Sequence, residues 1–340
     1  MPRNHITSIV TTVAWLACST LLANPPDPSP DPSPEMVEAA IRKSIPMLER
    51  GAAGSAKQRK CFTCHSQSVP VLALVEARRR GFTIDADNLK LQLQHTAAFL
   101  NRRKAKLLQG KGKTIIDGYA LWTLEAGGWK PDETTEAAAG FLLENQKQTG
   151  HWSDPGHRPP STGSDFTTTY VALHGLDAFG TRDQEPKIIA RKKTVQQWLL
   201  SETPRDTEDR VFRLRAFNYV DADDKTVRQA TTELLGSQQP DGGWSQVTGR
   251  KSDAYATGTV LVALIQSANT PADHPAVRRG VRFLVDRQLD DGTWHVKTRA
   301  KPFQTYFESG FPHGKDQFIS IAGSSWSTLA LLLTLPERGN

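Results

Sequence analysis

Three segments of the chain share one pattern of apolar and polar positions. Apolar or small residues stand 3, 4, 7, 8 and 11 positions before each of Gln146, Gln238 and Gln288. This spacing follows one face of an α-helix. After each glutamine, a short turn containing glycine leads to a tryptophan six residues on, at Trp152, Trp244 and Trp294. The chain is therefore predicted to repeat one helical unit.

The same periodicity predicts two kinds of helix in alternation. Helices with a single apolar face are expected at residues 35–50, 87–103, 133–146, 185–201, 224–238 and 274–288. More uniformly apolar helices are expected at residues 66–80, 114–126, 165–179, 207–219, 253–268 and 318–335. A helix that is apolar all round is buried by neighbours on every side. We predict an all-α fold, an (α/α)6 toroid with six inner and six outer helices, in which the first outer helix closes against the last pair.

Local signals refine these helix boundaries. Residues 51–60 are rich in glycine, alanine and lysine and are expected to form a loop. Asp224 and Asp273 are predicted N-caps, because their carboxylates can accept hydrogen bonds from free backbone N–H groups. Pro275 suits the first turn of the helix that follows.

The predicted topology places a site on one rim. If consecutive helices are antiparallel, all inner helices run the same way, and every connection from an outer to an inner helix lies at one end of the ring. The longest connections, at residues 148–164, 240–252 and 290–317, are of this kind. Long loops on a rigid scaffold and free helix N-termini often bind ligands. We expect a site on this rim or in the funnel below it.

A family resemblance rests on three features of the sequence. These are the turn from Gln238 to Trp244, the two similar turns at residues 146–152 and 288–294, and the Ser-Asp-Ala-Tyr-Ala-Thr-Gly run that begins at Ser252. These residues resemble the α/α-toroid superfamily of terpenoid cyclases and protein prenyltransferases, in which squalene-hopene cyclases carry such "QW" repeats. The resemblance runs from about residue 60 to residue 335. It implies an apolar central cavity suited to isoprenoids and, if the chain is an enzyme, cyclase-like chemistry. Both an enzyme and a binding protein without catalysis are compatible with this resemblance.

The active-site motifs of that superfamily are not reproduced in their usual places. Squalene cyclases use an Asp-x-Asp-Asp run, whose central acid protonates the substrate, to open an inner helix. Here the same string, from Asp221 to Asp224, precedes a predicted outer helix, and a loop with an N-cap explains it. The prenyltransferase zinc site needs a cysteine, and none follows Cys64. The Cys-Gly-Glu-Gln thioester run of complement-like toroids is also missing.

Acidic residues near the starts of inner helices are candidate proton donors. Asp117, Asp165 and Asp253 could face the funnel, or could cap their own helices. Asp253 has the strongest claim, because Tyr255 follows closely and the superfamily often carries functional acids at the matching place. A loop at residues 306–317, dense in aromatic and charged groups, adds Glu308 and His313. The candidate catalytic residues are therefore Asp253, Asp165, Glu308 and His313.

A short motif at the start of the first inner helix suggests a cofactor. Cys61-Phe-Thr-Cys64-His65 has the Cys-x-x-Cys-His pattern to which haem c is attached, with His65 as an iron ligand. A tight disulfide, free thiols, or a histidine that only packs are the alternatives. A zinc site would need more ligands. We expect no metal beyond the haem iron.

The N-terminus and the net charge bear on location and partners. Residues 1–23 resemble a signal peptide and residues 24–34 a proline-rich spacer before a single toroid domain at 35–340. A periplasmic or secreted protein is expected, with a retained membrane or lipid anchor as the alternative. The formal charge of +6 arises from clusters within helical segments, which indicates solvated faces. Peripheral contact with a membrane or an acidic ligand fits such faces better than a nucleic acid does.

Together these features predict an exported toroid that binds or transforms an apolar, isoprenoid-like small molecule or lipid, with haem c as a candidate cofactor. One alternative is a haem-bearing redox or interaction scaffold without catalysis. The other is a toroid acting on an acidic polysaccharide, which the basic charge favours. An apolar funnel would support the isoprenoid interpretation, and a charged funnel would support the polysaccharide one.

Overall fold

The computed structural model describes residues 31–336, except residues 155, 157 and 303–304. The predicted signal peptide and most of the proline-rich spacer lie outside these residues. Within them, no helix is long and apolar enough to cross a membrane.

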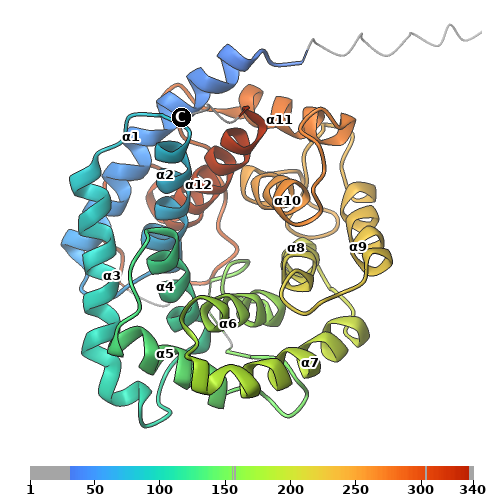
Figure 1. Cartoon of the computed structure of the whole chain (residues 1–340). Coiled ribbons are helices and arrows are strands. Elements are labelled where there is room, and N and C mark those ends of the chain that lie inside the picture. Colours follow the sequence, from blue (N-terminus) through green and yellow to red (C-terminus); the bar gives the residue numbers. More distant parts are fainter. Residues whose placement is uncertain (1–30, 155, 157, 303–304, 337–340) are drawn as a thin grey trace, which may run out of the picture. The chain divides into compact units, whose positions relative to one another are not determined.

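Twelve α-helices in the described part of the chain form a double ring (Figure 1). The outer helices are α1 (Pro34–Gln58), α3 (Ala86–Leu107), α5 (Glu133–Glu144), α7 (Glu185–Ser201), α9 (Asp224–Gly236) and α11 (Pro275–Arg287). The inner helices are α2 (Val69–Arg79), α4 (Thr114–Ala126), α6 (Asp165–Phe179), α8 (Thr207–Phe217), α10 (Ala254–Ser267) and α12 (Gln317–Thr334). Three shorter turns are η1 (Cys64–Ser68), η2 (Arg182–Gln184) and η3 (Gly314–Asp316). The predicted toroid is confirmed.

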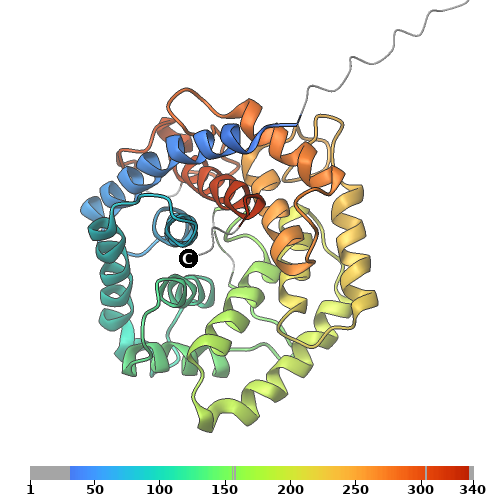
Figure 2. The ribbon, with the colours of Figure 1, turned by 45° about the horizontal axis from the view of Figure 1, so that its top comes forward.

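The inner ring closes on itself. Each inner helix packs against the next, and α12 packs against both α10 and α2. Small residues allow close approach: a Cβ on Gly258 of α10 would lie 2.7 Å from the backbone nitrogen of Ser327 on α12. The first outer helix, α1, lies across α12 (Figure 2), as predicted.

The repeated glutamines and tryptophans hold the outer ring together. Each glutamine donates two hydrogen bonds from Nε2. One goes to the carbonyl of the glycine four residues later, and the other goes to a backbone carbonyl of the next outer helix around the ring. Gln288 thereby joins α11 to Ala40 of α1 over 2.8 Å and closes the circle. Each tryptophan is buried and donates from Nε1 to a carbonyl of the preceding helix, as Trp244 does to Leu234 over 2.8 Å. These glutamines and tryptophans therefore have a structural role in the outer ring.

Three boundary predictions were wrong. Helix α1 continues to Gln58 through the expected loop, because its small residues face the core: a Cβ on Gly54 would lie 1.8 Å from the carbonyl oxygen of Ser309. The N-cap of α9 is Asp223 rather than Asp224, and it accepts a hydrogen bond from the Thr226 N–H over 2.7 Å. The N-cap of α11 is His274 rather than Asp273, with Pro275 in the first turn as expected.

The long connections meet on one rim, as predicted. The backbone N–H of Thr207, at the start of α8, donates to the carbonyl of Gln246 in the α9–α10 connection over 3.3 Å. Arg299 of the α11–α12 connection donates from Nε to the side chain of the same Gln246 over 2.8 Å. The start of α8 and the α9–α10 and α11–α12 connections are therefore bonded to one another on this rim.

Candidate functional site

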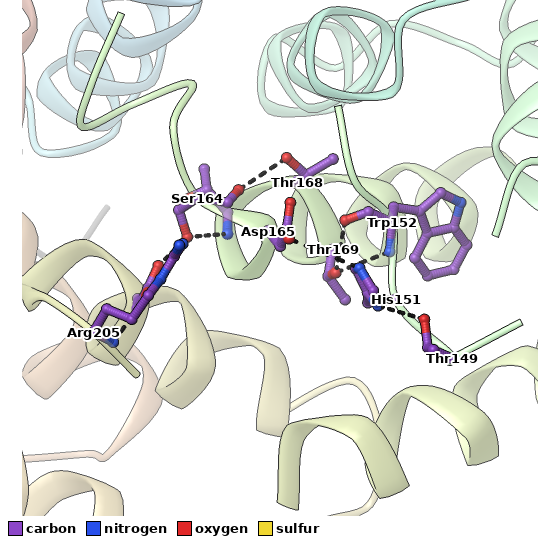
Figure 3. Close-up of polar contacts among 10 residues, drawn as sticks. Thr149, His151, Trp152, Ser164, Asp165, Thr168, Thr169 and Arg205 are labelled. Carbon is purple, nitrogen blue, oxygen red and sulfur yellow. Dashed lines mark hydrogen bonds and ion pairs between the residues drawn. The ribbon is translucent and has the colours of Figure 1, made fainter. Parts of the chain in front are cut away.

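An acidic run, Asp206-Thr-Glu-Asp209, opens the inner helix α8. Asp206 is the N-cap and accepts a hydrogen bond from the Asp209 N–H over 3.1 Å. Buried Asp209 accepts from the hydroxyl of Ser164 over 2.6 Å and from the N–H of Arg205 over 3.0 Å; Ser164 and Arg205 are labelled in Figure 3. These two acids fix the first turn of α8, which leaves the side chain of Glu208 inside the ring.

Glu208 has the hydrogen bonding of a carboxylic acid that keeps its proton. Its Oε1 accepts from the hydroxyl of Thr167 on α6 over 3.0 Å and from that of Tyr255 on α10 over 3.2 Å. Its Oε2 is buried without a hydrogen-bond partner among the described residues. Burial, and next the charge of Asp206, raise the pKa of Glu208 to about 8. The carboxyl is therefore mostly protonated at neutral pH. Because Oε1 already accepts two hydrogen bonds, the proton belongs on Oε2.

Aromatic side chains surround the axis of the ring next to Glu208. Tyr119 stacks on Trp122 with ring centroids 5.9 Å apart, and Trp122 lies 6.1 Å from Trp326 and 5.1 Å from Tyr170. These rings come from α4, α6 and α12. The hydroxyl of Tyr119 interacts electrostatically with Glu208, and burial raises its pKa well above the usual value. Aromatic rings from three inner helices therefore pack together inside the ring, and Tyr119 connects them to the acid.

Polar atoms without partners recur along the inner elements. Within the described residues, the buried side-chain atoms that lack a hydrogen bond include Gln67 Nε2, Tyr119 Oη, Glu208 Oε2 and Trp326 Nε1. Leaving such an atom unsatisfied costs roughly 1–3 kcal/mol. Each such atom on an inner element indicates a point where a ligand or a water molecule can supply the missing partner.

A pocket of about 600 Å³ leads toward these rings from the rim opposite the long connections. Its wall includes Trp122, Tyr170 and Arg215, together with Glu125 and Ser267 near the ends of α4 and α10. Arg215 donates to the hydroxyl of Tyr170 over 2.9 Å, and its guanidinium lies 5.3 Å from the Trp122 ring centroid. The aromatic faces of Trp122 and Tyr170 therefore already contact a cationic group, the guanidinium of Arg215.

A second pocket, of about 690 Å³, lies on the rim of the long connections. Its wall includes His65 and Ser66 beside α2, Arg158 of the α5–α6 connection, and residues of the α11–α12 connection from Lys297 to Phe318. Cys61 is exposed and Cys64 is buried, and both are free thiols. Burial raises the pKa of Cys64 to about 11. Burial, followed by the charge of Arg158, lowers the pKa of His65 well below its usual value, so the imidazole is neutral.

The candidate acids at inner-helix starts have local partners. Asp253 caps α10, accepting from the Ala256 N–H over 3.0 Å, and burial raises its pKa to about 6. Asp117 is buried and pairs with Arg103 over 3.1 Å. Asp165 is the first residue of α6, and its Oδ2 lies 3.8 Å from His151 Nε2 (Figure 3).

Glu308 and His313 stand beside the larger pocket. Exposed Glu308 accepts from the hydroxyl of Tyr306 over 2.5 Å. His313 has a φ of +83° and stacks on His295 with ring centroids 4.6 Å apart. Their neighbours in sequence, including Phe307, line the pocket. The four predicted catalytic residues thus have separate partners, and none of the hydrogen bonds given above links them to one another.

Sequence reasoning missed Glu208. The literal Asp-x-Asp-Asp string does lie before an outer helix, where Asp223 caps α9. The run at 206–209 has the same spacing, with glutamate at its third position, and it opens an inner helix. The signal was available, because residues 207–219 were already predicted to form an inner helix.

Part of the chain is similar in sequence to known cyclases. Residues 174–334 match the family model of the squalene-hopene cyclase C-terminal domain. The chain is 32% identical over 117 residues to squalene–hopene cyclase of Bradyrhizobium diazoefficiens, covering 29% of this chain and 16% of that protein. It is 33% identical over 97 residues to lanosterol synthase of Candida albicans, covering 25% and 13%. The match therefore spans less than a fifth of each of these relatives.

Solved structures extend the likeness to most of the chain. The type II terpene cyclase MstE from Scytonema, in complex with its substrate geranylgeranyl dihydroxybenzoate, superposes with a TM-score of 0.58 at 12% identity, covering 89% of this chain and 99% of that one. A glycosidase superposes with a TM-score of 0.55 at 11% identity, covering 87% and 98%. At such identities the likeness concerns the fold alone. The chain thus has the α/α-toroid fold found in type II terpene cyclases, and residues 174–334 are similar to the C-terminal domain of squalene-hopene cyclases.

Proposed function

We propose that this protein binds an isoprenoid-like ligand along the axis of its ring and transfers a proton to it from Glu208. The observation that carries the proposal is the setting of this carboxyl: it is buried, burial raises its pKa to about 8, and its Oε2 has no hydrogen-bond partner among the described residues. A buried carboxylic acid whose proton is not donated to another protein group is suited to protonate a carbon–carbon double bond of a bound ligand.

The reaction can be written with its electrons balanced. The π electron pair of an alkene takes the proton from Glu208 Oε2, which forms a C–H bond and leaves a tertiary carbocation and a carboxylate. Thr167 and Tyr255 already donate to Oε1, and their hydrogen bonds strengthen as negative charge develops. The cation is then consumed by internal double bonds and ends by losing a proton, so the product is a cyclic isomer of the substrate.

The surrounding rings support a cationic intermediate. The guanidinium of Arg215 lies over the faces of Trp122 and Tyr170, and this contact supports a role for these rings in stabilising positive charge. The aromatic axis also favours an apolar ligand over an acidic polysaccharide, although a glycosidase has the same fold. Two relatives are named for cyclic triterpenoid chemistry, and MstE was solved with a geranylgeranyl substrate. These names support the substrate class proposed here.

Incubation with squalene and with a geranylgeranyl-substituted aromatic acid tests the proposal. We expect at least one of them to give a cyclic isomer of unchanged mass, detected by gas chromatography and mass spectrometry. The same reaction in D2O should introduce one deuterium into the product. Failure to form an isomer or to bind either compound would count against the proposed function.

A matched pair of variants identifies the donor. Glu208→Gln keeps the size of the side chain but removes the acidic proton, and we expect turnover to fall by at least a thousandfold. Asp223→Asn changes the corresponding acid of the literal Asp-x-Asp-Asp string, and asparagine remains a good N-cap for α9. This control should keep turnover within twofold of the wild type. If the two variants behave in the opposite way, Glu208 is not the proton donor.

A further inference from the structure

The Cys-x-x-Cys-His segment and the larger rim pocket form one part of the fold. The π-helical turn η1 begins at Cys64 and places His65 and Ser66 in the pocket wall. Thr63 fixes this turn, because its N–H and hydroxyl donate to Gln67 Oε1 over 2.9 and 2.6 Å. The facing wall belongs to the α5–α6 and α11–α12 connections. A ligand in this pocket would therefore contact the motif and two long connections together.

Arg158 lines the pocket and also lies near the cysteines of the motif. Its guanidinium lies 4.5 Å from the ring centroid of Phe318, and both residues line the pocket. The ring of His65 meets the same Phe318 edge-on, with centroids 5.4 Å apart. Cys61 and Cys64 both interact electrostatically with Arg158. The thiols of Cys61 and Cys64 therefore lie close to Arg158, and His65 is the residue of the motif that stands in the pocket wall.

The pocket wall combines apolar surface with positive charge. Phe307 and Phe318 contribute aromatic rings, while Lys297, Lys301 and Lys315 contribute cations in addition to Arg158. The acid in the wall, Asp316, is already engaged by the Thr298 N–H over 3.0 Å and by His295 over 2.9 Å. Such a wall suits a flat apolar ring that carries carboxylates. A volume of about 690 Å³ lies within the range of cofactor sites.

We propose that this pocket holds a haem covalently bound to Cys61 and Cys64, with His65 as an axial ligand of the iron. Each thiol adds across one vinyl group of the porphyrin: a C–S bond forms, the thiol hydrogen passes to the other vinyl carbon, and the π bond is lost. The addition needs neither an oxidant nor a reductant. Haem attachment of this kind takes place outside the cytoplasm, so the proposal includes export of the chain. When bound, the haem would supply one-electron transfer chemistry.

Covalent haem is tested on the full chain, expressed with its own N-terminus in a host with cytochrome c maturation proteins. We expect haem to remain on the protein after denaturing electrophoresis, with a Soret band in the native protein. Cys61→Ala combined with Cys64→Ala should abolish this covalent haem. His65→Ala should alter the visible spectrum of any haem it retains. His95→Ala is the control. His95 lies outside the motif, and its Nε2 is 3.3 Å from the carbonyl oxygen of Cys61.

Two results would overturn the attachment. One is an exported wild-type chain without haem in which both thiols still titrate. The other is a haem-free chain whose mass is lower by two hydrogens, which would show a disulfide. Circular dichroism of each variant establishes that loss of haem does not follow from loss of folding.

A second pair of variants tests the pocket itself. Ala300 lines it, and Ala300→Trp should reduce haem content at least tenfold by filling the space of the ring. Ala86→Trp places the same side chain at an exposed position on α3 and should leave haem content unchanged. Equal haem in Ala300→Trp and the wild type would show that the ring lies elsewhere. Glu208→Gln should carry a full complement of haem, so this proposal and the proposed proton transfer can fail separately.

Discussion

Tyr255 on α10 donates a hydrogen bond from its hydroxyl to Oε1 of Glu208 on α8, over 3.2 Å, inside a ring of aromatic side chains. Both side chains are buried. The bond joins adjacent inner helices and orients the carboxyl so that its other oxygen has no partner in the described part of the chain. A contact that stabilises the fold therefore also determines which oxygen carries the proton.

Removal of this hydroxyl should weaken the acid. In Tyr255→Phe the carboxylate formed after proton transfer loses one of its two donors, which raises the pKa of Glu208 further and lowers its acidity. A hydrogen bond to a charged group contributes about 1.5–3 kcal/mol, so we expect turnover to fall roughly 10- to 100-fold. Steady-state rates of isomer formation provide the measurement.

Tyr306→Phe is the matched control for that change. Tyr306 also donates to a glutamate, Glu308, but this pair is exposed on the rim. Turnover should stay within twofold of the wild type. Equal losses in the two variants would show that the Tyr255 hydroxyl has no special relation to the reacting group.

The raised pKa of Glu208 predicts how stability depends on pH. In the unfolded chain this carboxyl ionises near its ordinary value of 4.5, whereas in the folded chain it keeps its proton up to about pH 8. Between these values the unfolded state binds fewer protons, so the free energy of unfolding should fall as pH rises, by up to about 1.4 kcal/mol per pH unit. Above about pH 8 this contribution levels off.

Urea denaturation at a series of pH values can isolate this effect. Glu208→Gln cannot ionise, so the variant should show a flatter dependence than the wild type between pH 5 and pH 8. Isomer formation by the wild type should also decline above about pH 8, as the protonated fraction falls tenfold per pH unit. Parallel stability curves for the two proteins would contradict the assigned pKa.

Substitutions of Asp253 can distinguish a helix-capping role of this residue from a catalytic one. Its Oδ1 accepts from the Ala256 N–H over 3.0 Å, so Asp253→Ala should cost about 1–2 kcal/mol of stability, measured by urea denaturation. Asp253→Asn should cost much less, because asparagine caps nearly as well. If the residue only caps α10, turnover of Asp253→Asn should stay within threefold of the wild type. A thousandfold loss in this variant, with Glu208→Gln still active, would move the proton donor to Asp253.

The tryptophans of the repeat should contribute stability without catalysis. Trp244→Phe removes the bond from Nε1 to the Leu234 carbonyl and leaves space in a fully buried site. We expect a loss of about 2–4 kcal/mol in urea denaturation. Trp129→Phe is the control, since Trp129 is half-buried and donates to Asp132 at the surface, and its loss should stay below about 1 kcal/mol.

The sequence predicts the double ring because each part of the repeat acts locally. A helix face, a glutamine and a tryptophan recur at fixed spacing, and each tryptophan bonds to a carbonyl ten residues earlier, as Trp244 does to Leu234. The extent of α1 was not predictable in this way. Glycine and alanine at residues 51–54 indicate a loop by propensity, but close packing against the α11–α12 connection favours small residues within a helix.

The candidate site was harder to predict because its chemistry depends on contacts between distant residues. Asp253 and Glu208 both stand at inner-helix starts, and only their partners distinguish them. Asp253 accepts a hydrogen bond from the first turn of its own helix, whereas Glu208 is held by Thr167, 41 residues away, and by Tyr255, 47 residues away. The spacing of the run at 206–209 was readable, but the unpartnered Oε2 appears only once α6, α8 and α10 are assembled.

Two helical glycines test how tightly the rim is packed. A Cβ on Gly54 of α1 would collide with the carbonyl of Ser309, a residue of the larger pocket, whereas a Cβ on Gly236 of α9 would meet nothing within 4 Å. Gly54→Ala should therefore destabilise the protein by about 1–3 kcal/mol through overpacking. Gly236→Ala should stabilise it by about 0.5–1 kcal/mol, because alanine is the better helix former. Thermal and urea denaturation of both variants provide the measurement. If Gly54→Ala is as stable as Gly236→Ala, the α11–α12 connection does not pack against α1, and the wall of the larger pocket is not held in place by this contact.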